Sequence, residues 1–130
     1  MKPKLTFWVA FGLSIVLGAL IWICSPRFTG LAEPWDASGY YWQISLLVAG
    51  FLPAVFSPQR FWLWPFGVLF GQLVVFGVRV IQGPPSALWP VGVMYLVLFS
   101  ALTFVGAFIG WASRRVLGRM FASCQLHHDA

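Results

Sequence analysis

Residues 5–24 read LTFWVAFGLSIVLGALIWIC, and this run contains no charged side chain. A helix rises about 1.5 Å per residue, so the run would extend about 30 Å as a helix. That length matches the hydrocarbon core of a bilayer, which is also about 30 Å thick. The run therefore predicts a transmembrane helix.

Three further apolar runs follow the first one along the chain. They cover about residues 40–56, 61–81 and 88–111. Short breaks that contain proline separate the four runs, at Ser25-Pro26, Ser57-Pro58 and Gly83-Pro84-Pro85. Because proline and glycine end helices, each break marks a turn between two membrane crossings. We therefore expect an all-α membrane protein, an antiparallel bundle of four transmembrane helices within residues 1–112.

The composition supports a lipid environment for the chain. Of its 130 residues, 60% are hydrophobic and only 8% are charged, whereas a soluble domain carries about 25% charged residues. The net charge of +5 does not indicate nucleic-acid binding, because the cations lie at the ends of apolar runs and form no basic stripe. We therefore expect the lipid bilayer as a partner, and no nucleic acid.

A cleaved signal peptide is an alternative interpretation of the first run. Lys2 and Lys4 precede the run, and Gly30-Leu31-Ala32 fits a small-residue cleavage site. However, the apolar part of a signal peptide is about 7–15 residues long, and residues 5–24 exceed that length. A transmembrane helix is therefore the preferred interpretation.

The distribution of the cations predicts how the chain threads the membrane. With four crossings, most cations fall on one side, namely Lys2, Lys4, Arg60, Arg114, Arg115 and Arg119. Arg27 and Arg79 fall toward the other side, together with Glu33 and Asp36. Cytoplasmic loops carry an excess of Lys and Arg. Both termini should therefore be cytoplasmic, and residues 113–130 should form a short basic cytoplasmic tail.

The eight tryptophans lie at or near the expected ends of the helices. They are Trp8, Trp22, Trp35, Trp42, Trp62, Trp64, Trp89 and Trp111. Indole rings concentrate at the level of the lipid headgroups, where one end of the ring is apolar and the other is wet. The positions predict an aromatic belt at the membrane surfaces.

Small residues predict where the helices contact each other. Lipid gives helices no hydrophobic reason to associate, so close approach at small residues carries much of the packing. The third helix has Gly67 and Gly71 at GxxxG spacing, and the fourth has Gly106 and Gly110. We expect contacts within one bundle, although the same spacing also fits an oligomer interface. Short connections predict that the second and third helices, and the third and fourth, are antiparallel neighbours.

Arg79 is the only charged residue inside the expected spans, near the outer end of the third helix. Its long side chain can reach the headgroups from there, which is the simpler interpretation. Alternatively, Arg79 pairs with Glu33 or Asp36 and holds the first external loop over the third helix. Pro34 lies between the two acids, so they do not share a helix face. Asp36 or Ser38 is also expected to cap the second helix.

Gln72 lies two helical turns before Arg79, on the same face of the third helix and near the middle of the bilayer. A buried amide without a partner is costly, so we expect Gln72 to hydrogen-bond to another helix. The candidate partners are the hydroxyls of Ser14, Ser45, Ser100 and Thr103. In the alternative interpretation, a polar line from Gln72 to Arg79 faces a substrate or cofactor pocket.

The sequence contains none of the standard catalytic motifs, such as GxSxG, HExxH, a Walker loop or GxGxxG. His127, His128 and Asp129 lack the spacing of a preorganised metal site. No Asp, Glu or His lies inside the expected spans, which weighs against proton-coupled transport. We therefore expect no enzyme activity, no catalytic residues, no cofactor and no metal.

These observations favour a small multi-pass membrane protein. The first interpretation is an accessory or structural subunit of a membrane complex, or a homo-oligomeric bundle, which contacts other membrane-protein subunits or itself. The second is a passive small-molecule transporter, a channel or a membrane-embedded ligand binder. The candidate functional polar residues are Gln72, Arg79, Glu33 and Asp36. The compact build favours a cell membrane, and specifically a bacterial inner membrane.

Overall fold

The computed structural model describes residues 3–31, 33–36, 39–83 and 88–128. These residues form five α-helices and two short 3-10 helices, and no strand occurs among them. The α-helices are α1 (Pro3–Thr29), α2 (Tyr41–Phe56), α3 (Trp64–Gln82), α4 (Trp89–Phe99) and α5 (Ala101–His128). The 3-10 helices are η1 (Pro34–Asp36), which precedes α2, and η2 (Pro58–Leu63), which leads into α3.

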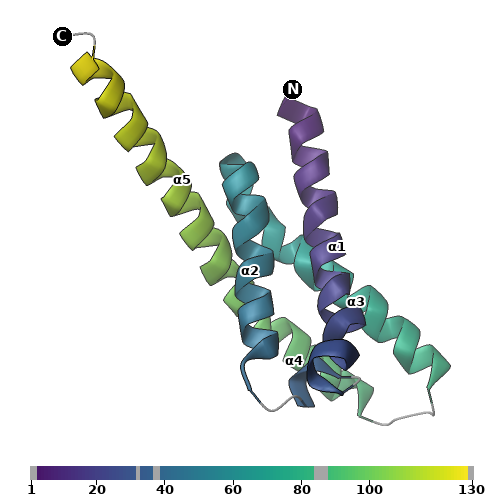
Figure 1. The fold of residues 1–130 in the computed structure, drawn as a ribbon. Coiled ribbons are helices and arrows are strands. Elements are labelled where there is room, and N and C mark those ends of the chain that lie inside the picture. The colour runs from purple at the N-terminus through teal and green to yellow at the C-terminus, as the bar shows by residue number, and fades with distance from the viewer. Residues whose placement is uncertain (1–2, 32, 37–38, 84–87, 129–130) are drawn as a thin grey trace.

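Successive crossings alternate in direction, as Figure 1 shows. α1 and α3 run toward one end of the molecule, whereas α2 and the pair α4–α5 run back. The beginning of α1 and the end of α5 therefore lie at the same end of the bundle. This arrangement agrees with the threading expected from the cations, in which both termini share one side of the membrane.

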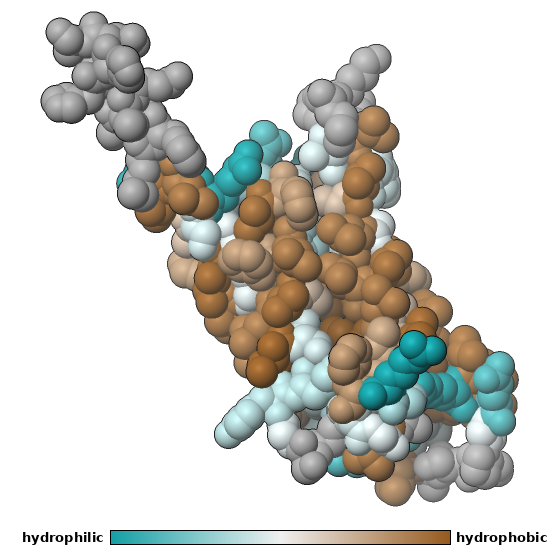
Figure 2. All heavy atoms as spheres, viewed as in Figure 1, coloured by the Kyte–Doolittle hydropathy of each residue, from teal (hydrophilic) through white to brown (hydrophobic). Residues whose placement is uncertain are grey.

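Three helical segments are long and apolar enough to cross a membrane, namely Leu5–Thr29, Pro58–Gln82 and Trp89–Arg119. The remaining segment, α2, is a shorter apolar helix. Figure 2 shows hydrophobic residues over the sides of the bundle, with hydrophilic residues gathered toward its ends. An apolar surface of this extent belongs in contact with lipid. The predicted fold class, an all-α membrane bundle, is confirmed.

The first helix is longer than the sequence predicted. α1 continues past Ser25-Pro26 to Thr29 instead of ending at Cys24. The Thr29 hydroxyl donates to the Ser25 carbonyl at 2.9 Å, which supports the last turn. A proline inside a helix leaves the carbonyl four residues earlier without its usual donor. In α1 that carbonyl belongs to Trp22.

The fourth span is two helices instead of one. α4 ends at Phe99 and α5 begins at Ala101, so a break falls at Ser100. The Ser100 hydroxyl donates to the Leu96 carbonyl at 2.7 Å, and the Thr103 hydroxyl donates to the Ser100 carbonyl at 2.6 Å. Hydroxyls that bond back to the preceding turn compete with the backbone hydrogen bonds and bend helices.

α5 and α3 have these limits. α5 continues from the fourth span to His128, so residues 113–128 of the predicted basic tail are helical. The third α-helix begins at Trp64, later than predicted, because the 3-10 helix η2 precedes it. Arg60 within η2 has non-helical angles, with φ −135° and ψ 44°, which separate this turn from the α-helix that follows.

The closest helix pairs are α1 with α3 and α2 with α5. Neither pair is consecutive in the sequence, and the two members of each pair run in the same direction (Figure 1). The pairs predicted as antiparallel neighbours, α2–α3 and α3–α4, do contact each other, but less extensively. The tightest packing in the bundle is therefore between parallel helices.

Glycines bring the backbones of both close pairs together. Between α1 and α3, Gly18 lies against the Val68 carbonyl, Gly71 against the Ile15 carbonyl, and Gly67 against the Ser14 hydroxyl. Between α2 and α5, Gly50 lies against the Thr103 carbonyl, Gly106 against the Leu47 carbonyl, and Gly110 against the Phe51 carbonyl. A Cβ atom at any of these glycines would overlap its neighbour. Close backbone approach of this kind is how small residues pack membrane helices.

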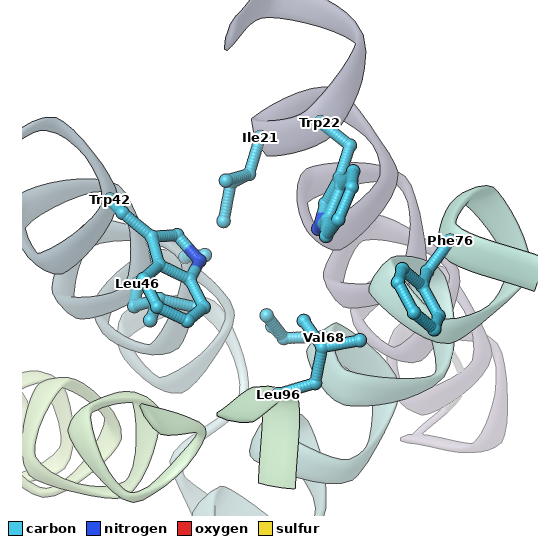
Figure 3. Packing of buried hydrophobic residues seen from close by; sticks show 8 residues of the cluster. Ile21, Trp22, Trp42, Leu46, Val68, Phe76 and Leu96 are labelled. Atoms are coloured by element: carbon cyan, nitrogen blue, oxygen red, sulfur yellow. The ribbon is translucent and has the colours of Figure 1, made fainter. Parts of the chain in front are cut away.

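Three tryptophans lie in the core and not in a belt at the membrane surface. Trp22, Trp42 and Trp64 expose 0%, 3% and 0% of their surface. Figure 3 shows Trp22 and Trp42 on opposite sides of the core, with Val68 and Leu96 between them. The belt prediction fails for these residues because nearness to a span end does not fix the face of the helix. The tryptophans that are more than half exposed are Trp8, Trp62 and Trp89.

Candidate functional site

A partly open cavity of about 550 Å³ lies at the end of the bundle opposite the chain termini. Its walls come from α1 and α3 near their C-terminal ends, from the first loop, and from the start of α4. The charged residues in the walls are Glu33, Asp36 and Arg79, and the aromatic ones are Trp22, Trp35, Phe76, Trp89 and Tyr95. We refer to this cavity as the aromatic cleft. Small-molecule sites in proteins have volumes of about 300–1,000 Å³.

Arg79 lies beside the turn of α1 that precedes Pro26. Its Nη2 atom donates to the Trp22 carbonyl oxygen at 3.1 Å, and this is the oxygen that Pro26 leaves without a backbone donor. The guanidinium also lies over the Trp22 ring, 5.3 Å from its centroid, where a cation is attracted to the π face. From the sequence we expected lipid headgroups or an acidic side chain as the partner of Arg79, and did not expect the backbone of α1.

A second backbone carbonyl in this part of α1 also accepts a hydrogen bond from a side chain. The Tyr41 hydroxyl, at the start of α2, donates to the Ile21 carbonyl at 2.9 Å. Pro26 removes the backbone donor of the Trp22 carbonyl alone, and an unpaired carbonyl is costly away from water, so the donor from Arg79 helps α1 to continue through Pro26. The hydroxyl of Tyr41 adds a side-chain bond to a carbonyl of the same turn. α2 and α3 each contribute one donor, and together they fix the end of α1 beside the aromatic cleft.

The two acids of the first loop lie in and beside η1. Glu33 Oε2 accepts a hydrogen bond from Trp35 Nε1 at 2.7 Å, whereas Asp36 is exposed. The prediction that Asp36 caps α2 is wrong, because η1 ends at Asp36 and the chain turns again before α2. The residue at the cap position is Tyr40, and it makes no side-chain hydrogen bond there. The alternative cap, Ser38, lies outside the described residues.

Trp35 occupies the centre of the aromatic wall. Its ring lies edge-to-face with the rings of Trp22 and Phe76, at centroid distances of 4.9 and 5.8 Å. It also approaches the rings of Trp42 at 5.9 Å and Tyr95 at 6.4 Å. Such aromatic pairs contribute about 0.5–1.5 kcal/mol each beyond area burial. Trp35 therefore ties the first loop to four helices and links the cleft to the core.

Gln72 lies one turn before Phe76, deeper in the bundle than the cleft. Its side chain is fully buried, and its Oε1 accepts a hydrogen bond from Trp42 Nε1 at 3.3 Å. A partner on another helix was predicted, but an indole and not a hydroxyl supplies it. The hydroxyls of Ser14, Ser100 and Thr103 donate to carbonyls of their own turns instead. Within the described part of the chain, Gln72 Nε2 and Trp22 Nε1 are buried without a hydrogen-bond partner.

The aromatic cleft brings together Glu33, Asp36 and Arg79, and it leaves out Gln72. The glycines expected to mediate packing lie in the helix contacts described above, away from the cleft. Sequence reasoning missed Pro26, which was interpreted only as a stop signal. Among the described residues, no group of three His, Cys, Asp or Glu side chains is placed to hold a metal ion.

The missing backbone donor at Pro26 leads to a prediction about Arg79. Replacing Pro26 by Ala gives the Trp22 carbonyl a backbone donor, so the carbonyl no longer depends on the guanidinium. We expect Arg79→Gln to lower the free energy of unfolding by about 1–3 kcal/mol in the unmodified chain, and by less than half of that in the Pro26→Ala background. A double-mutant cycle of unfolding in mixed micelles measures the difference. Equal losses in both backgrounds would contradict the role assigned to Arg79.

Comparison with known proteins gives a partial similarity to a transporter. The chain is 39% identical over 63 residues to a lactose permease of Klebsiella oxytoca. The matched region is 48% of this chain and 14% of the permease, so the chain spans a small part of that protein's length. No family model matches the chain, and no solved structure matches it.

Proposed function

We propose that the protein is a membrane-embedded binder of a small molecule, related in role to transporters, and that the aromatic cleft is its binding site. The observation that carries the proposal is the cleft, where charged groups and aromatic rings surround a cavity of about 550 Å³. Binding sites for small molecules are concave and largely apolar, with a few well-placed polar groups. The proposed role involves binding only, without a catalytic step.

The partial similarity to a lactose permease supports a role related to transport. The similarity extends over 63 residues, which are 14% of the permease. For this reason the proposal takes neither the sugar nor the whole activity of the permease as its own. The proposed location is a bacterial inner membrane, because the matched protein is bacterial and the chain is a multi-pass helical bundle.

The packed core favours binding over passive conduction. Leu46, Val68 and Leu96 are fully buried beneath the cleft side of the bundle. Figure 3 shows these side chains in the same cluster as Trp22 and Trp42. A passive channel needs a continuous opening between its two ends, and a buried apolar cluster across the bundle disfavours one. Transport through this bundle would therefore require the pair α1–α3 to move against the pair α2–α5.

Calorimetric titration of the protein in nanodiscs tests the proposal. The probes are lactose, leucine, tetraethylammonium and benzoate, which represent a neutral sugar, a zwitterion, a cation and an anion. We expect saturable binding of at least one probe, and loss of that binding in Val91→Trp, which fills the cleft from the wall of α4. The matched control is Val97→Trp, which is also exposed on α4 but lies outside the cleft. Absence of binding by every probe would refute the proposal.

The end of α5 favours a second candidate function, as an accessory or structural subunit or a homo-oligomer. The C-terminal part of α5 stands apart from the other helices (Figure 1), and Val116 and Leu117 of this helix are exposed. An apolar surface at this position fits contact with another membrane-protein subunit or a second copy of the chain. Purification in mild detergent distinguishes the candidates. A stoichiometric larger partner supports this one, and a single chain that binds ligand supports the first.

A further inference from the structure

The aromatic cleft presents ring surface that a ligand can reach. Trp89 and Tyr95, both from α4, are 53% and 49% exposed, and Trp35 of the first loop is half-buried. Trp22 and Phe76, the other two aromatic residues of the wall, are buried and pack against Trp35. Aromatic rings attract cations to their faces, and cages of such rings recognise alkylated ammonium groups. The aromatic lining therefore suits a cationic ligand.

The 3-10 turn η1 brings two carboxylates to this cavity. The Asp36 backbone N–H donates to the Glu33 carbonyl at 3.2 Å. Side chains three residues apart are eclipsed in a 3-10 helix, so the two acids project from the same side of the turn. Both residues line the aromatic cleft. A ligand in the cleft therefore meets the two acids together.

Glu33 lies beside an aromatic ring and keeps capacity to accept hydrogen bonds. Its Oε2 atom accepts from Trp35 Nε1 at 2.7 Å, which holds the carboxylate next to the indole. A carboxylate has about four lone-pair positions, and this hydrogen bond takes one of them. Hydrogen bonds between charged groups are stronger than those between neutral ones. An ammonium group that binds Glu33 would therefore gain a strong contact and would also lie close to the Trp35 ring.

Negative charge exceeds positive charge in the walls of the cleft. Glu33 and Asp36 are both there, and Arg79 is the one cation among the described residues that line it. The Arg79 guanidinium is engaged by the carbonyl and the ring of Trp22. Charges interact more strongly in a partly desolvated cleft than in open water. A cation that enters the cleft therefore gains net attraction, whereas an anion meets net repulsion.

We propose that the aromatic cleft binds an organic cation, namely an ammonium group that carries apolar substituents. The ammonium group lies against the carboxylates of Glu33 and Asp36, beside the Trp35 ring. The apolar substituents contact Tyr95 and Val91 on the wall of α4. This inference rests on the proposed function and names the ligand class for the same site.

Probes that share one carbon skeleton test the inference. The amine 3-methylbutylamine is a cation, 3-methylbutanol is neutral and 4-methylpentanoate is an anion, while tetraethylammonium adds a cation without N–H donors. The protein is embedded in nanodiscs of phosphatidylglycerol and digalactosyldiacylglycerol, two lipids without an ammonium group, and empty nanodiscs are the blank. By calorimetry at neutral pH, we expect at least one cation to bind about 10-fold more tightly than the alcohol and the carboxylate, or better.

The outcomes separate this inference from the function on which it rests. If the alcohol, the carboxylate, lactose or benzoate binds the cleft at least as tightly as both cations, the inference is wrong and the proposed function stands. If none of the probes binds, both are wrong. Cation binding that survives in Val91→Trp, which fills the cleft, would place the cation site elsewhere and would also overturn the inference.

Removing the acids one at a time tests their part in binding. Glu33→Gln keeps an acceptor for Trp35 and should weaken cation binding about 10-fold. Asp36→Asn changes an exposed residue, so we expect a smaller loss of about 3-fold. The matched control is Asp129→Asn, which removes the same charge from the predicted cytoplasmic tail and should change binding by less than about 2-fold. Equal losses in all three variants, or no loss in either cleft variant, contradict the inference.

The ammonium group can belong to a free small molecule or to the headgroup of a phospholipid, and lipid composition distinguishes these sources. Phosphatidylethanolamine and digalactosyldiacylglycerol both carry no net charge, but only the first has an ammonium group. Exchanging the galactolipid for phosphatidylethanolamine therefore leaves the surface charge unchanged. Cation binding that weakens about 3-fold or more on this exchange supports the inference with a headgroup as the occupant. Unchanged affinity supports it with a free organic cation as the ligand.

Discussion

Gly71→Leu should lower the free energy of unfolding by about 3 kcal/mol and prevent α1 and α3 from closing against each other. A Cβ atom at Gly71 overlaps the Ile15 carbonyl and comes within 2.9 Å of the Ala19 nitrogen. Both neighbours are backbone atoms of α1, so no change of side-chain rotamer relieves the overlap. Unfolding in mixed micelles, followed by tryptophan fluorescence, measures the loss.

Gly77→Leu is the matched control for this variant. Gly77 lies on the same helix, and a Cβ atom there meets nothing within 4 Å. We expect its stability to stay within about 1 kcal/mol of the unmodified chain. Equal losses at Gly71 and Gly77 would contradict the assigned contact. If the Gly71 loss depends on protein concentration, the glycine instead lies in an interface between chains.

Trp64→Ala should be the most damaging truncation, with a loss of about 3–5 kcal/mol. The Trp64 side chain is fully buried, and its ring lies 5.5 Å from that of Phe7. Its Nε1 atom also donates to the Ser57 carbonyl at 3.0 Å. The substitution therefore leaves both a cavity and a carbonyl without its donor. Thermal unfolding in detergent, monitored by size-exclusion chromatography, measures the effect.

Trp62→Ala controls for the loss of an indole near the same end of the bundle. Trp62 lies in η2 and is 52% exposed, so its removal opens no internal cavity. We expect a change within about 1 kcal/mol. A loss as large as that of Trp64→Ala would mean that general interfacial anchoring, and not core packing, explains the effect of both residues.

The fold class was accessible from the sequence because an apolar run of bilayer length has few alternatives. Which face of each helix is buried could not be predicted from the sequence. In lipid, the outward face and the buried face are both apolar, so no alternation of polar and apolar residues separates them. Trp8 and Trp22 both lie near the predicted ends of the first span, yet the first is 66% exposed and the second is fully buried.

Part of the candidate site could be predicted from the sequence. Glu33, Asp36 and Arg79 stood out because charges are rare in this chain, and the structure gathers them around one cleft. The role of Pro26 was hidden, because it depends on an arginine 57 residues away from the carbonyl that the proline exposes. That contact is a product of helix packing, and no local pattern contains it.

The interleaved order of the close pairs has a consequence for assembly during synthesis. α1 is made first and finds its parallel partner when α3 follows, but α2 is made between them and has its close partner in α5, the last described helix. A nascent chain that ends after α3 therefore contains one completed pair and a helix whose Gly50 face is still open to lipid. Insertion can proceed one helix at a time. The contact between α2 and α5 can form only after α5 has been made.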